Sequence, residues 1–410
     1  MPEKSNNRLN AMRGTGKLAV DAILGITNIV DSMHRTILSL GGRIGDPEQT
    51  QTTGLTGMVY QTVRTITETV GHGLDSSLSQ LNSLAIMQDG EPAAGREAVL
   101  AALNGVLGDY LVATNNPLAI TMGFYRAGEL LNNTELSETV KQANGKIAIM
   151  LHGSCMNDLQ WERKGHDHGG AIFRDLGITP LYLRYNSGLH TSENGKEFSA
   201  LLEALLAQSE EPMELTIVAH SMGGLVARSA YHYGKEYGHT WMKHLTKIVF
   251  LGTPHHGAPL EKGGNWIDTL LEISPYSTPF AQLGKIRSSG VTDLRYGNLL
   301  DEDWQGKDRF KRSDDLRTAV PLPDGVLCYA IAGTITQNAS KLGDGLIGDG
   351  LVTVDSALGR HPNLQRQLLF PESHQSVCRG INHVDLLSNL DVYETLKRWL
   401  ADGKLETSAD

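Results

Sequence analysis

A serine between a predicted strand and a predicted helix is the residue of this sequence best suited to chemistry. Residues 214–231 read ELTIVAHSMGGLVARSAY, and the apolar run before the serine is typical of the end of a buried strand. Ser221 follows in a tight turn, and the residues after it have the composition of a packed helix. A strand, a turn with a central serine and a helix form a nucleophile elbow, which presents the hydroxyl to a base and a substrate.

Small residues around this turn favour the same interpretation. Ala219 and Gly223 stand two positions before and two positions after Ser221, so strand and helix can approach each other closely. The pattern is therefore A-x-S-x-G, with alanine where the usual motif has glycine. The alternative is that Ser221 only caps the helix N-terminus, which is a common role of serine. The motifs elsewhere in the chain favour the nucleophile.

A serine hydroxyl is a weak nucleophile and needs a neighbouring base. His383 lies in the stretch GINHVD, shortly before a predicted closing helix, where a loop can reach the serine. The base needs a carboxylate that fixes its tautomer and stabilises the imidazolium. Asp344 in GDGLI and Asp349 in GDGLV both follow the serine and precede the histidine. Each also fits a simple Asp-Gly turn, so these residues leave the choice between them open.

Acyl transfer to a serine also requires two N–H donors for the oxyanion. We expect one from Met222, directly after the nucleophile, and one from Ser154, in the turn after a strand predicted over 146–151. Cys155 and Met156 are expected to line the acyl side of the pocket. Cys155 lacks the surroundings of a catalytic cysteine, so we do not propose it as a nucleophile. The residues assigned to substrate contact are His152, Gly153, Cys155 and His220.

A His-Asp-His motif precedes two glycines further along the chain. His166 and His168 flank Asp167 and could suggest a metal site. Two imidazoles and a carboxylate without a further fixed ligand are weak evidence for a metal. We interpret them as polar loop residues and predict neither a metal nor a cofactor.

The elements that must position these residues alternate in type from Gly145 onwards. Apolar runs predict strands over 146–151, 181–185, 214–218, 245–251, 328–333 and 367–370, and helices over 196–208, 224–231 and 386–400. Ser388 is a candidate cap of the last helix. This alternation predicts an α/β fold, with a mostly parallel sheet and helices on both faces. The site of such a sheet lies beyond the carboxyl ends of its strands, where the turns above fall.

Two regions depart from the alternation. Residues 1–140 show helical spacing of apolar residues over 18–40, 58–81, 92–111 and 117–131, and predict a helical N-terminal region ahead of a catalytic domain over 141–410. Its faces lack a basic side, which favours a cap or an oligomerisation surface over a membrane-docking surface. Residues 259–320 form an insertion. We interpret it as a lid rather than a solvated excursion, because long loops in compact domains are usually functional or disordered.

Composition narrows the class of protein. The 410 residues carry a formal net charge of -10, which argues against a general nucleic-acid binder. Cys155, Cys328 and Cys378 are far apart and fit neither a disulfide framework nor a zinc motif, which indicates a reducing compartment. The first residues lack the apolar core of a secretory signal, and no run of about 18 apolar residues predicts a membrane span. We therefore predict a cytoplasmic protein.

Five motifs in order resemble the bacterial esterase/lipase family of the α/β-hydrolases, over roughly residues 145–400. They are a strand ending in HG, then AHSMGG, LGTPHHGA, GDGLVTVDSALG and INHVDLL. The chain is similar to triacylglycerol lipases and to proteins likened to the GPI inositol-deacylase. The resemblance implies an α/β-hydrolase fold with Ser221 as nucleophile, Asp349 as acid and His383 as base. The SALG stretch after GDGLVTVD matches the family and favours Asp349 over Asp344.

The resemblance also has departures. Ala219 replaces the first glycine of the elbow, and secreted lipases lack the helical N-terminal region. Some bacterial lipases bind calcium through the aspartate two residues after the catalytic histidine. Asp385 holds that position, but no second carboxylate is evident, and an aspartate there can equally cap or pair.

The sequence as a whole predicts a serine hydrolase that cleaves carboxylic esters, most of all lipid-like acyl esters. A thioesterase or an acyltransferase would use the same triad. A non-catalytic hydrolase-fold protein that binds partners through its helical region is the alternative from another class, and the ordered Ser, Asp and His argue against it.

Overall fold

The computed structural model describes residues 93–207, 213–258, 288–308, 315–337 and 348–401. The chain divides into two compact units, one of Met1–Pro92 with Leu111–Ala119 and one of Ala93–Tyr110 with Ile120–Asp410. Of the first unit, only 111–119 are described, and they contain the end of helix α4 (Ala93–Ala113) and a loop. The second unit contains the sheet and the predicted site.

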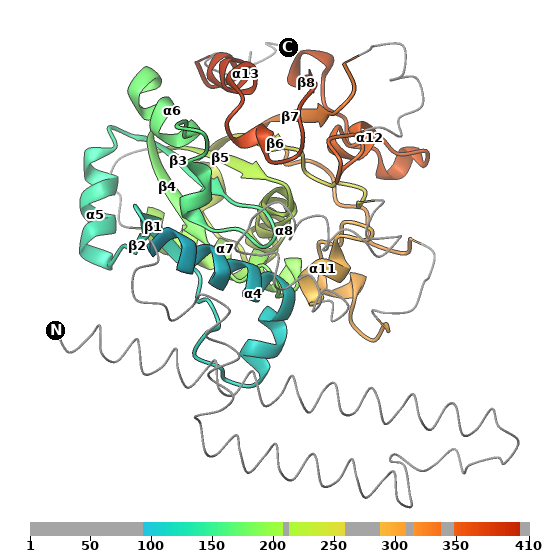
Figure 1. Cartoon of the computed structure of the whole chain (residues 1–410), viewed down its shortest axis with the longest axis horizontal. Coiled ribbons are helices and arrows are strands. Elements are labelled where there is room, and N and C mark those ends of the chain that lie inside the picture. The colour runs from blue at the N-terminus through green and yellow to red at the C-terminus, as the bar shows by residue number, and fades with distance from the viewer. Residues whose placement is uncertain (1–92, 208–212, 259–287, 309–314, 338–347, 402–410) are drawn as a thin grey trace, which may run out of the picture. The chain divides into compact units, whose positions relative to one another are not determined.

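The second unit is built on one eight-stranded sheet in the order β2-β1-β4-β3-β5-β6-β7-β8 (Figure 1). The strands from β3 to β8 pair in parallel, and the first two join one edge in antiparallel fashion. The strands are β1 (Gly123–Arg126), β2 (Glu129–Leu130), β3 (Lys146–Leu151), β4 (Thr179–Arg184), β5 (Glu214–His220), β6 (Leu245–Leu251), β7 (Leu327–Thr334) and β8 (Gln375–Arg379). This arrangement confirms the predicted α/β class with a mostly parallel sheet.

Helices precede, connect and follow the parallel strands, because parallel strands need crossover connections. They are α5 (Asn133–Gln142), α6 (His168–Leu176), α7 (Thr191–Leu206), α8 (Met222–Tyr237), α11 (Ser289–Asp293), α12 (Val354–Ala357) and α13 (Leu390–Ala401). Short 3₁₀ turns occupy Asp158–Trp161, Trp241–Lys243, Asp301–Asp303, Leu364–Arg366, Glu372–His374 and Asp385–Leu387. The predicted strands over 146–151 and 245–251 have these same bounds in the structure.

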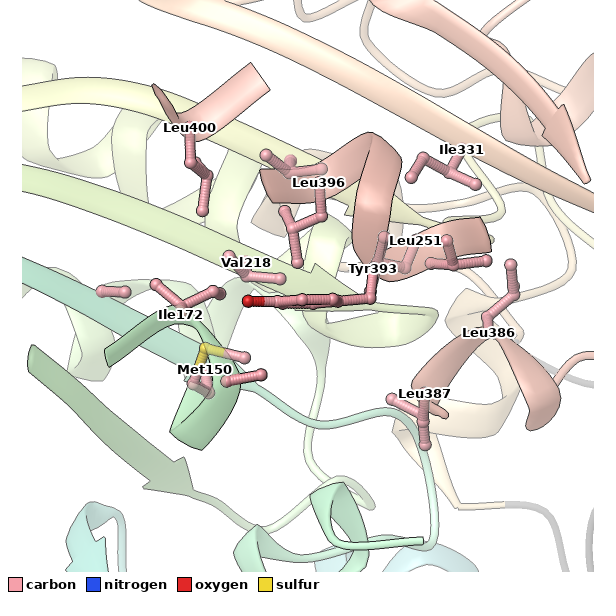
Figure 2. Close-up of a cluster of buried hydrophobic side chains, with 14 of the residues drawn as sticks. Met150, Ile172, Val218, Leu251, Ile331, Leu386, Leu387, Tyr393, Leu396 and Leu400 are labelled. Carbon is pink, nitrogen blue, oxygen red and sulfur yellow. The ribbon is translucent and has the colours of Figure 1, made fainter. Parts of the chain in front are cut away.

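The alternation of side chains along the strands divides the core between the two faces of the sheet. Met150, Val218 and Leu251 lie on one face and pack with Ile172 of α6 and Leu396 of α13 (Figure 2). Neighbouring positions along the same strands point to the opposite face and are equally buried. Burial on both faces explains why the central strands are continuous apolar runs rather than alternating ones.

The helix predicted over 117–131 is wrong where the chain forms β1 and β2. These strands make a hairpin whose two turn residues, Ala127 and Gly128, have φ values of 51° and 83°. A two-residue turn with positive φ at both positions matches the twist of paired strands. Positive φ values do not occur in a right-handed helix, so the predicted helix cannot run through this turn. Because β1 also pairs with β4, this part of the predicted N-terminal region belongs to the sheet. The helix predicted over 92–111 is confirmed as α4.

The strand predicted over 367–370 is also wrong. Those residues follow a 3₁₀ turn, and the last strand is β8, Gln375–Arg379, which pairs with β7. The closing helix begins at Leu390, later than predicted, and Ser388 does not cap it. The side chain of Asn389 accepts hydrogen bonds from the N–H groups of Asp391 and Val392 and caps the helix instead.

Several predictions fall outside the described residues. They are the helices over 18–40 and 58–81, Asp344, and most of the lid interpretation, because 259–287 and 309–314 are not described. The remainder of the insertion contains α11 and the 3₁₀ turn at Asp301–Asp303. Within the described ranges, no helix is both long and apolar enough to span a bilayer.

Candidate active site

Ser221 forms the turn between β5 and α8, as an elbow requires. Its φ of 53° and ψ of -124° are unusual for a residue with a side chain, and such a conformation costs about 1–3 kcal/mol. The Ser221 N–H donates to the carbonyl of Leu251 at 2.9 Å, which fixes the turn to the end of β6. This strained backbone conformation directs the Ser221 side chain away from both β5 and α8.

Two glycines make the close approach at this turn possible. A Cβ atom built on Gly223 would lie 2.7 Å from the carbonyl oxygen of His152, so only glycine lets α8 meet the end of β3. A Cβ atom on Gly153 would lie 3.0 Å from Ser221 Cβ. The turn after β3 therefore lies directly against the predicted nucleophile. Ala219, in the place of the usual first glycine, is fully buried in β5.

The predicted base and acid form a buried pair at the ends of the neighbouring strands. His383 Nδ1 donates to Asp349 Oδ2 at 2.6 Å, and both side chains are at most 2 % exposed. The other carboxylate oxygen, Oδ1, accepts from the N–H groups of Leu351 and Val352 at 3.0 and 2.9 Å. Three donors therefore orient the Asp349 carboxylate. Because Nδ1 of His383 carries the proton of this hydrogen bond, Nε2 is the ring nitrogen that can accept a proton.

The pair and the serine meet at the end of β6. A Cβ atom built on Gly252 would lie 3.1 Å from His383 Cε1 and 3.2 Å from Asp349 Oδ2. Gly252 directly follows Leu251, whose carbonyl accepts the hydrogen bond from the Ser221 N–H. His220, next to the serine in the chain, has its ring centroid 4.7 Å from that of His383. Neither Ser221 Oγ nor His383 Nε2 makes a hydrogen bond to another described group, although both atoms are buried.

The predicted oxyanion donors occupy two adjoining turns. Met222 is the first residue of α8, so its N–H has no carbonyl partner one turn earlier in the helix. Ser154 is 1 % exposed in the turn after β3. The N–H of the next residue, Cys155, donates to Ser187 Oγ at 2.9 Å, so it is not free to bind the oxyanion. Sequence reasoning missed Ser187, whose only signal was its place just after β4.

His152 and Cys155 were predicted to contact substrate, and the structure buries both. Tyr185 N donates to His152 Nε2 at 3.3 Å and His152 Nδ1 lies 2.8 Å from the Gly153 carbonyl, so both ring nitrogens have partners within the protein. Burial lowers the pKa of His152 to about 3. Burial likewise raises the pKa of the Cys155 thiol to about 12, which argues against a thiolate nucleophile.

Helix α4 packs on the same turns, which the sequence did not indicate. A Cβ atom built on Gly105 would lie 2.2 Å from Cys155 Sγ, and one on Gly108 would lie 1.8 Å from Asn186 Oδ1. Ser288 Oγ, just before α11, donates to the Gly105 carbonyl at 2.6 Å. The helix thus contacts the turns after β3 and β4 as well as the start of α11.

The three residues of the His-Asp-His motif have partners within the protein, and His168 is buried. His168 Nε2 lies 2.9 Å from the Leu386 carbonyl, and His168 Nδ1 lies 2.8 Å from His166 Nε2. Asp167 caps α6. The described part of the chain contains no group of three or more histidines, cysteines or acidic residues that could hold a metal ion.

Asp385, the position compared with a calcium ligand, forms an ion pair with Lys164 at 2.7 Å. The Asn382 N–H donates to the other carboxylate oxygen of Asp385 at 3.4 Å. Burial raises the pKa of Asp385, but the contacts with Lys164 and Asn382 outweigh this effect and leave the pKa below its usual value. The carboxylate is therefore paired in the way that the sequence left open.

Comparison with known proteins gives a family for part of the chain. The model of the family described as PGAP1-like alpha/beta domain matches residues 181–320, which include β5, Ser221 and β6. A comparison with curated protein sequences returned no significant match.

Solved structures of lipases resemble the chain at low identity. Bacillus licheniformis lipase BlEst2 in its mature form is 17% identical, with a TM-score of 0.40, over 62% of this chain and 92% of that one. Lipase 1 from Pelosinus fermentans is 12% identical, with a TM-score of 0.41, over 64% of this chain and 100% of that one. Staphylococcus hyicus lipase is 15% identical, with a TM-score of 0.36, over 63% and 95%. At these values nothing about activity is transferred from the lipases.

The sheet order, the strand-turn-helix at Ser221 and the matched family segment agree with one another. The chain therefore has an α/β-hydrolase fold, and its residues 181–320 match the PGAP1-like alpha/beta domain.

Proposed function

We propose that the protein is a serine hydrolase that cleaves carboxylic esters with lipid-like acyl groups. The single observation that carries the proposal is the buried hydrogen bond of 2.6 Å between His383 and Asp349, beside the end of β6 to which the Ser221 N–H also bonds. The unpartnered Oγ and Nε2 atoms are the two atoms that a serine hydrolase must keep available.

In this proposal Ser221 Oγ attacks the ester carbonyl carbon while its proton passes to His383 Nε2. The imidazolium is stabilised by the carboxylate of Asp349. The negative oxygen of the tetrahedral intermediate accepts hydrogen bonds from the N–H groups of Met222 and Ser154. Collapse of the intermediate releases the alcohol, which takes the proton from His383. Water then gives a proton to His383 and attacks the acyl carbonyl carbon. Collapse of this second intermediate breaks the bond to Ser221 Oγ, releases the carboxylic acid and returns the proton to Ser221.

The proposed substrate is a small-molecule ester or a lipid. Gly153 lies directly against Ser221, so the turn after β3 would border the bound ester. The preference for a lipid-like acyl group rests on the family resemblance. No cofactor takes part in the proposed reaction.

We also infer a cytoplasmic location. Cys155, Cys328 and Cys378 are free thiols in the structure, as expected in a reducing compartment. Contact with a lipid surface and association through the N-terminal region remain parts of the proposal that rest on the sequence.

A panel of p-nitrophenyl esters of increasing acyl length tests the function, with acyl thioesters as a second panel. We expect turnover of the esters and a kcat/KM that rises with acyl length. Greater turnover of thioesters would reassign the enzyme to a thioesterase. Absence of turnover on both panels, in protein that is folded by circular dichroism, would contradict the proposal.

A further inference from the structure

The residue before the nucleophile contacts the predicted base. His220 is 1 % exposed, and its Nε2 lies 3.1 Å from the backbone carbonyl oxygen of His383. A carbonyl oxygen only accepts hydrogen bonds, so His220 Nε2 must carry the proton. This contact joins β5 to the loop of His383, which is 163 residues away in the sequence.

The tautomer of His220 follows from this contact. With Nε2 protonated, a neutral ring has a bare lone pair at Nδ1. His220 Nδ1 is buried and accepts no hydrogen bond from any described group. It lies 2.9 Å from the position of a Cβ atom built on Gly153, so the ring also borders the turn that holds Ser154.

The ring of His220 also packs on the ring of His383, with an angle of 44° between the planes. Burial, and next the neighbouring His383, lower the pKa of His220 well below its usual value. The imidazole is therefore neutral at neutral pH, and adds no positive charge beside the imidazolium that His383 becomes.

We propose that His220 is a positioning residue, which holds His383 in register with Ser221 by donating to its backbone carbonyl. This replaces the substrate contact that the sequence suggested for His220. The proposal rests on the proposed function, in which His383 is the base. The loop of His383 is also held by Asp349, by the Ile381 N–H bond to the Thr334 carbonyl and by the Lys164–Asp385 ion pair. His220 adds an attachment from the strand that carries the nucleophile.

Two substitutions separate positioning from packing. His220→Phe keeps an aromatic ring and removes the donor, whereas His220→Gln places an amide N–H near the position of Nε2. We expect His220→Phe to lower kcat by about a hundredfold with little change in KM, because small misplacements of a catalytic group cost on this order. His220→Gln should recover kcat to within about tenfold of the original protein.

The pH dependence of kcat/KM is the second readout, because it reports the ionisation of the base in the free enzyme. His220→Phe should displace the midpoint of the acidic limb, and His220→Gln should return it. Equal loss of kcat in both variants, with an unchanged midpoint, would show that His220 only fills space. Full activity of His220→Phe would overturn the proposal outright.

A measurement on the unsubstituted protein covers the case in which the variants do not fold. Nitrogen-15 NMR of histidine-labelled protein should show His220 protonated at Nε2 alone between pH 6 and 8. Protonation at Nδ1, or titration within this range, would contradict the proposal. Because this readout needs no turnover, it distinguishes failure of the positioning role from failure of the proposed esterase function.

Discussion

His383 and Asp349 are joined twice. The ring Nδ1 of His383 donates to the carboxylate of Asp349 at 2.6 Å, and the backbone N–H of His383 donates to the backbone carbonyl of Asp349 at 3.0 Å. The backbone bond fixes the separation of the two loops, and the side-chain bond then fixes the ring. This pair of contacts gives Asp349 a defined role in orienting the proposed base.

Asp349→Asn should therefore reduce kcat by about ten-thousandfold, because an amide favours the wrong tautomer of His383. Asp344→Asn, in the similar Asp-Gly sequence, is the matched control and should cost far less. Steady-state kinetics on a p-nitrophenyl ester gives both values. If Asp344→Asn were the more damaging change, the assignment of the acid would be wrong.

Gly105→Ala should disturb the turn after β3, which holds the predicted oxyanion donor Ser154. The added methyl group would lie 2.2 Å from Cys155 Sγ and 2.8 Å from Cys155 Cα, so the turn or α4 must move. We expect a lower kcat/KM and a loss of about 1–3 kcal/mol in the free energy of unfolding.

Gly170→Ala in α6 is the control, because its methyl group would approach only Asp167 Oδ2, at 3.3 Å. Alanine in place of a helical glycine usually stabilises a helix by about 0.5–1 kcal/mol, where space allows. Urea unfolding and ester kinetics on both variants provide the check. Equal behaviour of the two variants would mean that α4 does not constrain the turn.

Acid should destabilise the fold through its buried neutral histidines. Burial lowers the pKa of His168 from 6.5 to about 4, so between these values the unfolded chain binds a proton that the folded protein does not. The contribution of the neutral His168 to the free energy of unfolding is fully present above pH 6.5 and is lost as pH falls towards 4. His168→Gln should reduce the slope of unfolding free energy against pH, near pH 5, by about 1.4 kcal/mol per pH unit. Urea titrations at several pH values measure it, and an unchanged slope would contradict the burial of a neutral His168.

A buried ion pair fixes β4 to its neighbours. Arg184 Nε contacts Asp158 at 2.5 Å, Arg184 NH1 contacts Glu97 at 2.5 Å, and the guanidinium lies 4.1 Å from the centre of the Tyr125 ring. Arg184→Met leaves the Asp158 carboxylate buried without its partner, which should cost about 3–5 kcal/mol in unfolding free energy.

Arg174→Met provides the comparison, because the Arg174 side chain is 70% exposed in its pair with Asp175. Exposed pairs of this kind contribute about 0–1 kcal/mol. Urea midpoints of the two variants should differ clearly, and equal midpoints would show that Arg184 is not stabilised as a buried pair.

The sequence predicted the central strands well, because burial on both faces makes β3, β5 and β6 continuous apolar runs. It failed at the edges. The apolar residues Leu368 and Phe370 suggested a strand, but they are buried in a loop, where Phe370 packs on Phe250. The true edge strand, β8, reads QSVCR and is too polar to show as an apolar run.

The candidate site was predictable to the extent that its residues lie at strand ends. Ser221, Asp349 and His383 each follow a strand in the sheet, and parallel strands bring their carboxyl ends together. The contacts of Gly105 and Ser187 with Cys155, in the turn after β3, depend on how separate segments pack. No local pattern in the sequence carries that information.

Reaction with a fluorophosphonate tests the central claim most directly, because it requires an activated serine rather than any particular substrate. The folded protein should gain the mass of one phosphonyl group, and peptide mapping should locate it on Ser221. Ser221→Ala should gain no mass under the same conditions and should lose ester turnover by several orders of magnitude. Absence of the adduct from the folded protein, or its location on another residue, would contradict Ser221 as the nucleophile.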